Sequence, residues 1–159
     1  MTSTSHPKAI RAAIRILKAE NGFLIGDYKM KKSPGPLKDG PHKELFADGK
    51  VSGEGRLRSR KRHGVWKFYH RNGKVKAVGK YVDGALYGHW EWWRENGKPL
   101  QAGAFDGNVQ VGLWKRYYDS GRLWDEGRYE KGKKIGQWKT FAKDGSLKQS
   151  KVFKPGRQD

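Results

Sequence analysis

The sequence contains no cysteine, which excludes disulfide bonds and thiolate-ligated metal sites. It also has no apolar run near the ~20 residues that a helix needs to span a bilayer. The only apolar stretch near the N-terminus is interrupted by Arg11, Arg15 and Lys18, which is not typical of a signal peptide. We therefore expect a cytoplasmic protein.

Aliphatic and acidic residues are both scarce. Hydrophobic residues make up 35% of the chain, yet aromatic residues alone reach 13%, which is too many for a disordered chain. This balance favours a thin structure with a ladder of aromatic contacts. Lys and Arg outnumber Asp and Glu by 35 to 16, giving a net charge of +19. Such a charge indicates either a polyanionic partner or a solvated basic surface.

A 24-residue repeat dominates the second half of the sequence. Glycine and tryptophan columns recur in register, two residues apart, and they are followed by a second aromatic column, a second glycine and a third aromatic column. The first two columns are Gly64, Gly88, Gly112, Gly136 and Trp66, Trp90, Trp114, Trp138; the second aromatic column is Tyr69, Trp93, Tyr117, Phe141. A step of three residues between the two aromatic columns means either that both sheet faces carry aromatics or that a bulge realigns them.

Turn dipeptides recur at one phase of every unit. Asn72-Gly73 and its equivalents predict two-residue hairpin turns with positive φ at both central residues, and Asp83-Gly84 predicts the turn back. In the third unit this second turn comes one residue early, at Gly107, which a loop tolerates better than a strand does. Each unit is therefore predicted to be one hairpin, and the array an antiparallel meander.

The register divides the chain into an arm and five units. Residues 1–39 are predicted as an N-terminal helix, a possible strand and a Pro/Gly loop, residues 40–63 as a degenerate leading unit with His42 in the Trp position, and residues 64–159 as four regular units. The regular units are 64–87, 88–111, 112–135 and 136–159. The predicted fold class is mainly β, an elongated meander with a short N-terminal α-helix.

The pattern Gly-x-Trp-x-x-Tyr-x-x-Asn-Gly-Lys, followed by Gly-Lys-Tyr and Asp-Gly, resembles the variant MORN repeat, as found in the YwqK family of toxin–antitoxin antitoxin components. The resemblance covers about residues 40–154. It implies a β-hairpin array with a role in protein interaction, and MORN repeats are also linked to phospholipid membranes.

The arm combines an apolar stripe with basic residues. Ile10, Ala13, Ile14 and Leu17 recur at helical spacing after a Ser5 cap, with a stop at Asn21-Gly22. The helix either docks on a membrane or partner, or covers an open part of the sheet. Residues 23–30 are a possible added strand.

Basic residues are densest just before the first regular unit. We expect Arg56, Arg58 and Arg60 to project from one strand face, opposite Leu57, as a comb that contacts phosphates or repels other sheet edges. The candidates for polyanion binding are Arg56, Arg58, Arg60, Lys61, Arg62, Lys29, Lys31 and Lys32.

Aromatic residues outside the repeat columns are candidates for partner binding, since the fold does not demand them. They are Trp92, Trp124, Tyr87 and Tyr118. The regular Trp column is expected to be packing.

Catalysis finds no support in the sequence. The five histidines show no metal-ligand pattern, and there is no phosphate loop, nucleophile elbow or dinucleotide fingerprint. We expect no enzyme activity, no cofactor and no small-molecule substrate. The leading hypothesis is a protein-binding module, and an antitoxin- or immunity-like inhibitor of an acidic target is one form that it could take. The alternative is a binder of nucleic acid or anionic membrane.

Overall fold

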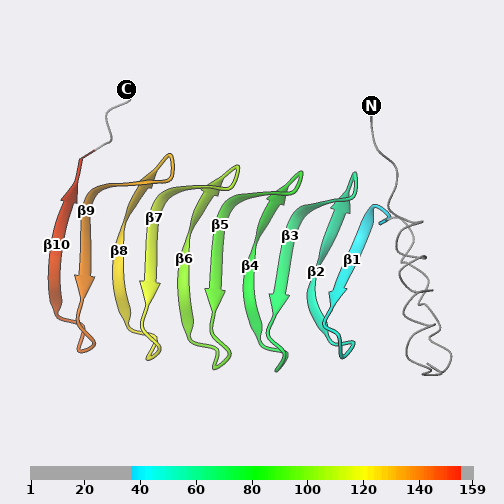
Figure 1. Cartoon of the computed structure of the whole chain (residues 1–159), viewed down its shortest axis with the longest axis horizontal. Coiled ribbons are helices and arrows are strands. Elements are labelled where there is room, and N and C mark those ends of the chain that lie inside the picture. Colours follow the sequence, from blue (N-terminus) through cyan, green and yellow to red (C-terminus); the bar gives the residue numbers. More distant parts are fainter. Residues whose placement is uncertain (1–36, 155–159) are drawn as a thin grey trace, which may run out of the picture. The chain divides into compact units, whose positions relative to one another are not determined.

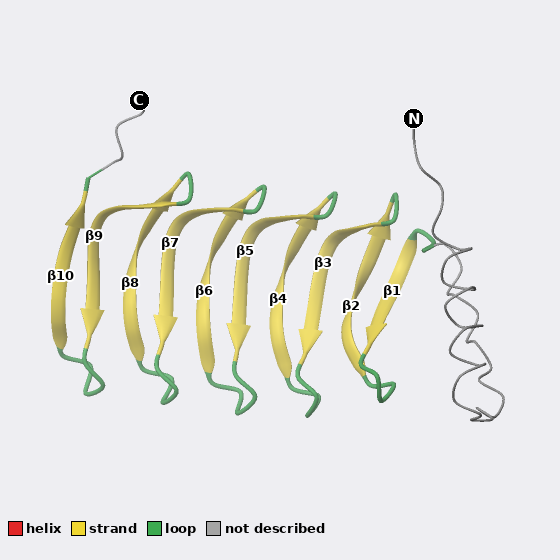
Figure 2. Cartoon of the chain, in the orientation of Figure 1, coloured by secondary structure: helices red, strands yellow, loops and turns green. Residues whose placement is uncertain are grey.

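The computed structural model describes residues 37–154, which form one antiparallel sheet of ten strands in sequential order (Figure 1). Figure 2 shows strands and loops alone in this part of the chain. The predicted meander of five hairpins is confirmed, whereas the predicted helix and the strand over 23–30 lie outside the described residues. The strands are β1 (Gly40–Leu45), β2 (Val51–Arg58), β3 (Lys61–Tyr69), β4 (Val75–Val82), β5 (Ala85–Trp93), β6 (Pro99–Asp106), β7 (Val109–Tyr117), β8 (Leu123–Glu130), β9 (Lys133–Phe141) and β10 (Leu147–Phe153).

The tryptophan column forms the core of this single layer. The four Trp side chains are between 0% and 6% exposed. Each indole lies flat against a glycine of the preceding strand: an added Cβ on Gly79 would be 2.0 Å from Trp90. The Trp90 indole N–H also donates to the Lys80 carbonyl at 3.2 Å, and the other three make equivalent bonds. Glycine is therefore required opposite each Trp because any side chain would occupy the place of the ring.

Further aromatic rings connect one tryptophan to the next. Phe68 stacks between Trp66 and Trp90, and Trp92 stacks between Trp90 and Trp114, with ring centroids 5.6–6.3 Å apart. Tyr81 meets Trp90 edge-on at 5.1 Å. We call this side of the sheet the tryptophan face.

Figure 1 shows that β3, β5, β7 and β9 bend near their starts, and each of these strands contains one glycine of the column at 64, 88, 112 and 136. These glycines have φ between 61° and 75°, a left-handed conformation that costs other residues strain. The register places Gly88 and His89 as extra residues on β5, since Gly79 pairs with Trp90 but Lys80 pairs with Tyr87. The bend turns the strand over its own indole ring, which explains how one layer buries a Trp.

Both faces of the sheet carry aromatic residues. Trp90 and Trp92 stack on the tryptophan face, whereas Trp93 lines a shallow depression of about 310 Å³ with His89 and Glu91 on the other side, which we call the open face. A further bulge lies between the two aromatic columns, but it is in the facing strand β4, where Phe68 pairs with Ala77 and Tyr69 with Val75.

The Asn-Gly and Asp-Gly loops differ from the prediction. Gly73 has φ of 83°, but Asn72 does not have positive φ, and His70 bonds to Lys74 across a three-residue loop. The Asn72 side chain accepts from the Lys74 N–H at 3.0 Å instead. The expected two-residue turn is therefore wrong here: the glycine supplies the only left-handed residue, and the Asn side chain stabilises the turn.

The turns at the opposite ends of the strands, which connect one hairpin to the next, have two residues. Asp83 and Gly84 both have positive φ, as do Gly107 and Asn108, which lie one full period later. The predicted early turn in the third unit is wrong, because the glycine has moved from the second to the first central position while the turn keeps its register.

Hydrogen bonds between successive units hold the 24-residue register at both ends of the strands, that is, at the two rows of turns. At the two-residue turns, Gly84 N–H donates to the Arg62 carbonyl, and Asn108 and Gly132 repeat the contact. At the three-residue loops, Arg94 donates to the Tyr117 carbonyl at 2.9 Å and Tyr118 to the Phe141 carbonyl at 2.8 Å. Each hairpin is thus fixed to the next at both ends.

Candidate binding surface

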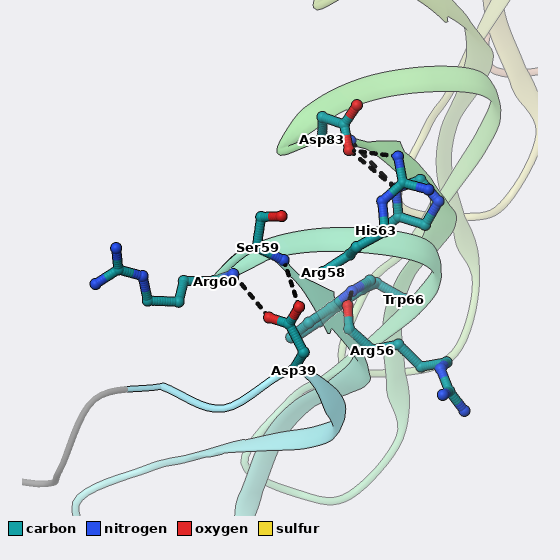
Figure 3. A network of polar contacts seen from close by, with 8 residues as sticks. All are labelled: Asp39, Arg56, Arg58, Ser59, Arg60, His63, Trp66 and Asp83. Carbon is teal, nitrogen blue, oxygen red and sulfur yellow. Dashed lines mark hydrogen bonds and ion pairs between the residues drawn. The ribbon is translucent and has the colours of Figure 1, made fainter.

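The arginine run does not form the predicted comb of three. Arg56 and Arg58 lie on β2, opposite the buried Leu57, but Ser59 and Arg60 form a two-residue turn with φ of 50° and 62°. Figure 3 shows the side chains of Arg56, Arg58 and Arg60 pointing in three directions. The comb fails because the strand ends at Arg58, and no Asn-Gly or Asp-Gly pair in the sequence marks this turn.

Two arginines of the run are occupied within the sheet. Arg58 pairs with Asp83 at 2.9 Å, beside His63 (Figure 3). Arg62 makes a two-pronged ion pair with Glu44 and lies over the rings of the tryptophan face, 4.9 Å from Trp66. Burial opposes its charge, but its bonds to Glu44 raise the pKa of Arg62. Of the predicted polyanion contacts, Arg56, Arg60 and Lys61 are exposed, while Lys29, Lys31 and Lys32 lie outside the described residues.

Asp39 holds the turn that carries Arg60. Its carboxylate accepts from the backbone N–H groups of Ser59 at 2.8 Å and Arg60 at 3.0 Å (Figure 3). The bonds from Arg60 and then Ser59 lower the pKa of Asp39. In later units a backbone carbonyl of the preceding hairpin accepts the equivalent N–H, and beside β1, the first described strand, the Asp39 carboxylate takes this place.

Charge is segregated along the sheet. Residues 56–82, the first basic block, contain ten basic residues and no acidic one. Residues 131–154, the last basic block, contain eight basic residues and only Asp144. Between them, residues 83–130 carry six basic and eight acidic residues. The net charge of +19 is therefore distributed unevenly between hairpins.

A basic depression lies on the open face near the start of the sheet. It has a volume of about 650 Å³ and is lined by Lys43, Arg56 and Lys67 together with Glu54. Lys43 lies 3.8 Å from Glu54, so Arg56 and Lys67 are its unpaired cations among the described residues. This places Arg56 among groups that attract an anion.

The four aromatic candidates have different environments. Trp92 lies in the ring stack between Trp90 and Trp114, which gives it a packing role that sequence reasoning missed. Tyr87 is 44% exposed on β5 and Trp124 is 38% exposed on β8. Tyr118 and Trp124 face each other with ring centroids 6.1 Å apart.

A pocket at the three-residue loops contains the last two of these residues. It has a volume of about 410 Å³ and is lined by Arg94, Tyr118, Trp124 and Lys143, among others. Arg94 pairs with Asp119 at 3.0 Å, and its Nε is buried without a partner in the described structure. We call this the Trp124 pocket.

A partly buried ion pair lies beside the Trp124 ring. Arg116 binds Asp125, which is only 5% exposed, and the guanidinium lies 4.4 Å from the Trp124 ring. The bond to Asp125 is the largest influence that raises the pKa of Arg116. The signal was in the sequence: Arg116 stands where earlier units have Phe68 and Trp92.

Residues 37–154 contain no cluster of three or more His, Asp or Glu side chains that could hold a metal ion. No helix among the described residues is long and apolar enough to cross a membrane.

Comparison with protein families agrees with the hairpin geometry. Residues 62–83 and 110–131 both match the model of the MORN repeat variant. These two segments of the chain are similar to MORN repeats. The two matches start 48 residues apart, which is two periods, and they coincide with the β3–β4 and β7–β8 hairpins. No curated protein matches the chain. The narrower resemblance to the YwqK family stays a prediction, because the matches describe the repeat alone.

Proposed function

We propose that this MORN repeat sheet is a non-catalytic binding module that engages another protein through an acidic surface of that protein. MORN repeats commonly serve as modules that bind proteins or membranes. The observation that carries the proposal is the segregation of charge into two basic blocks around a centre with an excess of acidic residues. An inhibitor of the antitoxin or immunity type, directed at an acidic target, is one role that this surface suits.

The centre of the sheet favours a protein partner over a uniform polyanion. Nucleic acid and anionic membranes present continuous negative charge, which the acidic residues of 83–130 would repel. The basic blocks and the centre both expose large apolar side chains, and those of the centre would lie in the middle of an interface, where such residues are typical, with charge at the rim. Those of the centre include Tyr87, Val109, Leu113 and Trp124.

The test compares partner capture by the wild-type chain and two charge-reversal variants. Lys67→Glu with Lys76→Glu changes the first basic block, and Lys98→Glu with Arg128→Glu makes the same charge change in the centre. We expect a stoichiometric protein to be retained by the wild type and the centre variant and lost from the block variant. Equal retention by all three would refute the role of the block.

The alternative of nucleic acid or anionic phospholipid is tested in parallel. Mixed-sequence duplex DNA and phosphatidylserine vesicles are titrated at ~0.15 M salt, where screening acts over about 8 Å. We expect weak binding that disappears as salt rises. Tight binding at this salt, with no captured protein, would replace the proposed function by the alternative.

A further inference from the structure

Three repeat positions change character between the ends and the centre of the sheet. At the three-residue loops, one position holds Arg71, Glu95, Asp119 and Lys143 in successive units, and another holds Lys76, Leu100, Trp124 and Lys148. At the two-residue turns, a third position holds Lys61, Ala85, Val109 and Lys133. The first two positions are therefore basic in the first and last regular units, and the third is basic in the leading unit and in unit 112–135. Between these units all three positions are acidic or apolar.

The basic residues at the three-residue loops of the first and last regular units are available for an external partner. Lys76, Lys143 and Lys148 are exposed and form no ion pair with any described residue. Arg71 pairs with Asp48 at 3.4 Å, with both side chains at least 40% exposed, which makes this pair weak. The acidic residues of the centre also have basic neighbours, Asp119 with Arg94 at 3.0 Å and Glu95 near His70 at 4.0 Å, but both carboxylates remain exposed.

The spacing of the two ends follows from the sheet. Lys76 on β4 and Lys148 on β10 are six strands apart in a sequentially ordered sheet. At ~4.8 Å per strand, this separation is about 29 Å. The Trp124 pocket on β8 lies between them, with Lys143 among its lining residues.

We propose that the three-residue-loop edge is a two-point docking surface for a protein segment with two acidic clusters about 29 Å apart and a large apolar side chain between them. One acidic cluster contacts Arg71 and Lys76, and the other contacts Lys143 and Lys148. The apolar side chain enters the Trp124 pocket. This proposal rests on the proposed function, because it names the chemistry and spacing of the protein partner.

Synthetic peptides test the spacing without knowledge of the natural partner. The first probe joins two tetraglutamate segments by a neutral Gly-Ser linker of about sixteen residues, whose mean reach is ~22 Å before the segments themselves are added. The second probe is contiguous octaglutamate, which has the same charge but extends to at most ~27 Å and cannot place four carboxylates on each end. We expect the linked peptide to bind at least ~10-fold more tightly at physiological salt, because its second contact is intramolecular.

Charge-reversal variants locate the two contacts. Lys76→Glu or Lys148→Glu alone should reduce binding of the linked peptide to the level of octaglutamate. Lys98→Glu, the matched control, makes the same charge change on the central loop and should leave most of the advantage intact. Equal or tighter binding of octaglutamate, or an equal loss in all three variants, would overturn the two-point proposal, since either result means simple charge attraction.

A separate binding measurement tests the Trp124 pocket. A phenylalanine placed in the middle of the linker should strengthen binding several-fold, and Trp124→Ala should abolish that gain while the linked peptide without phenylalanine binds as before. No gain from phenylalanine would remove the pocket from the proposal. If the linked peptide behaves as expected but no protein is captured, the proposed function fails while the docking surface stands. If a protein is captured but octaglutamate binds at least as tightly as the linked peptide, the docking surface fails while the proposed function stands.

Discussion

At the scale of single residues, each tryptophan is buried because its neighbour has no side chain. Gly55, Gly79, Gly103 and Gly127 leave space for the indole, and the ring hydrogen-bonds across the strand that it covers. The sequence revealed the tryptophan column, and these four glycines recur with the same period, although they were not predicted as part of the packing. It could not reveal that the two columns touch, because contact depends on the strand register and on the bend at the preceding glycine.

Gly79→Ala should therefore destabilise the sheet. Its Cβ would be 2.0 Å from Trp90, whose N–H bond to Lys80 opposes displacement. We expect a loss of roughly 1–3 kcal/mol in the free energy of unfolding, measured by urea denaturation. Gly53→Ala is the control, since its closest contact is 2.9 Å from an edge atom of Phe68, and it should cost less. Equal stability of Gly79→Ala and wild type would contradict this packing.

The Arg116–Asp125 ion pair occupies positions that hold Trp92 and Gln101 one unit earlier, and we expect those residues to replace it with little loss of stability. Asp125→Ala leaves the guanidinium without its carboxylate and should cost about 1–3 kcal/mol, less than for a fully buried pair because Arg116 is 38% exposed. Arg116→Trp combined with Asp125→Gln restores the residues found at Trp92 and Gln101 one unit earlier. This double variant should recover stability to within ~1 kcal/mol of wild type. A double variant less stable than Asp125→Ala would show that the pair itself is required.

At the scale of elements, the two kinds of turn explain what the sequence predicted well and what it did not. The Gly-containing dipeptides located nearly every turn, and the period located every hairpin. The loop type was assigned wrongly, because Asn-Gly suits both a two-residue turn and a three-residue loop, and only the strand pairing distinguishes them. The β2–β3 turn was missed because Ser59 and Arg60 are poor residues for positive φ.

Replacing Ser59 and Arg60 by Asn and Gly should stabilise this turn. Both residues have left-handed φ, which Asn and Gly adopt at lower cost. We expect a gain of about 1 kcal/mol in unfolding free energy. The reverse change in the next unit, Gly84→Arg, should lower stability by a similar amount, since Gly84 has φ of 89°. No gain in the first variant would indicate that Asp39 already offsets the strain.

Asp39 should make the first edge of the sheet sensitive to acid. Its pKa is lowered in the folded state, so it contributes stability above its unfolded pKa and loses that contribution as the pH falls through the lower folded value, below about pH 4. Hydrogen exchange of the Ser59 and Arg60 amides should accelerate in this range, and Asp39→Ala should remove both the protection and its pH dependence. Asp144→Ala, at a distant loop where Ser146 bonds lower the pKa of Asp144, should leave these two amides unchanged. Unaltered protection in Asp39→Ala would exclude the capping role.

At the scale of the whole sheet, function depends on what varies between units that share one backbone. The sequence predicted the array because its columns are constant. The candidate surface was harder to predict, because its residues are significant only when equivalent positions in different units are compared: Lys76 and Lys148 are ordinary exposed lysines until Leu100 and Trp124 are seen to stand between them. The arginine run, which was conspicuous in the sequence, is partly engaged in internal pairs with Asp83 and Glu44.

Lysine footprinting of the complex with a captured protein partner tests the central claim most directly. Acetylation rates of the exposed lysines are compared between the free and the bound chain by mass spectrometry. The account predicts protection of Lys76, Lys143 and Lys148 together, while Lys98 stays reactive. Protection confined to one end of the sheet, or spread evenly over all lysines, would contradict it.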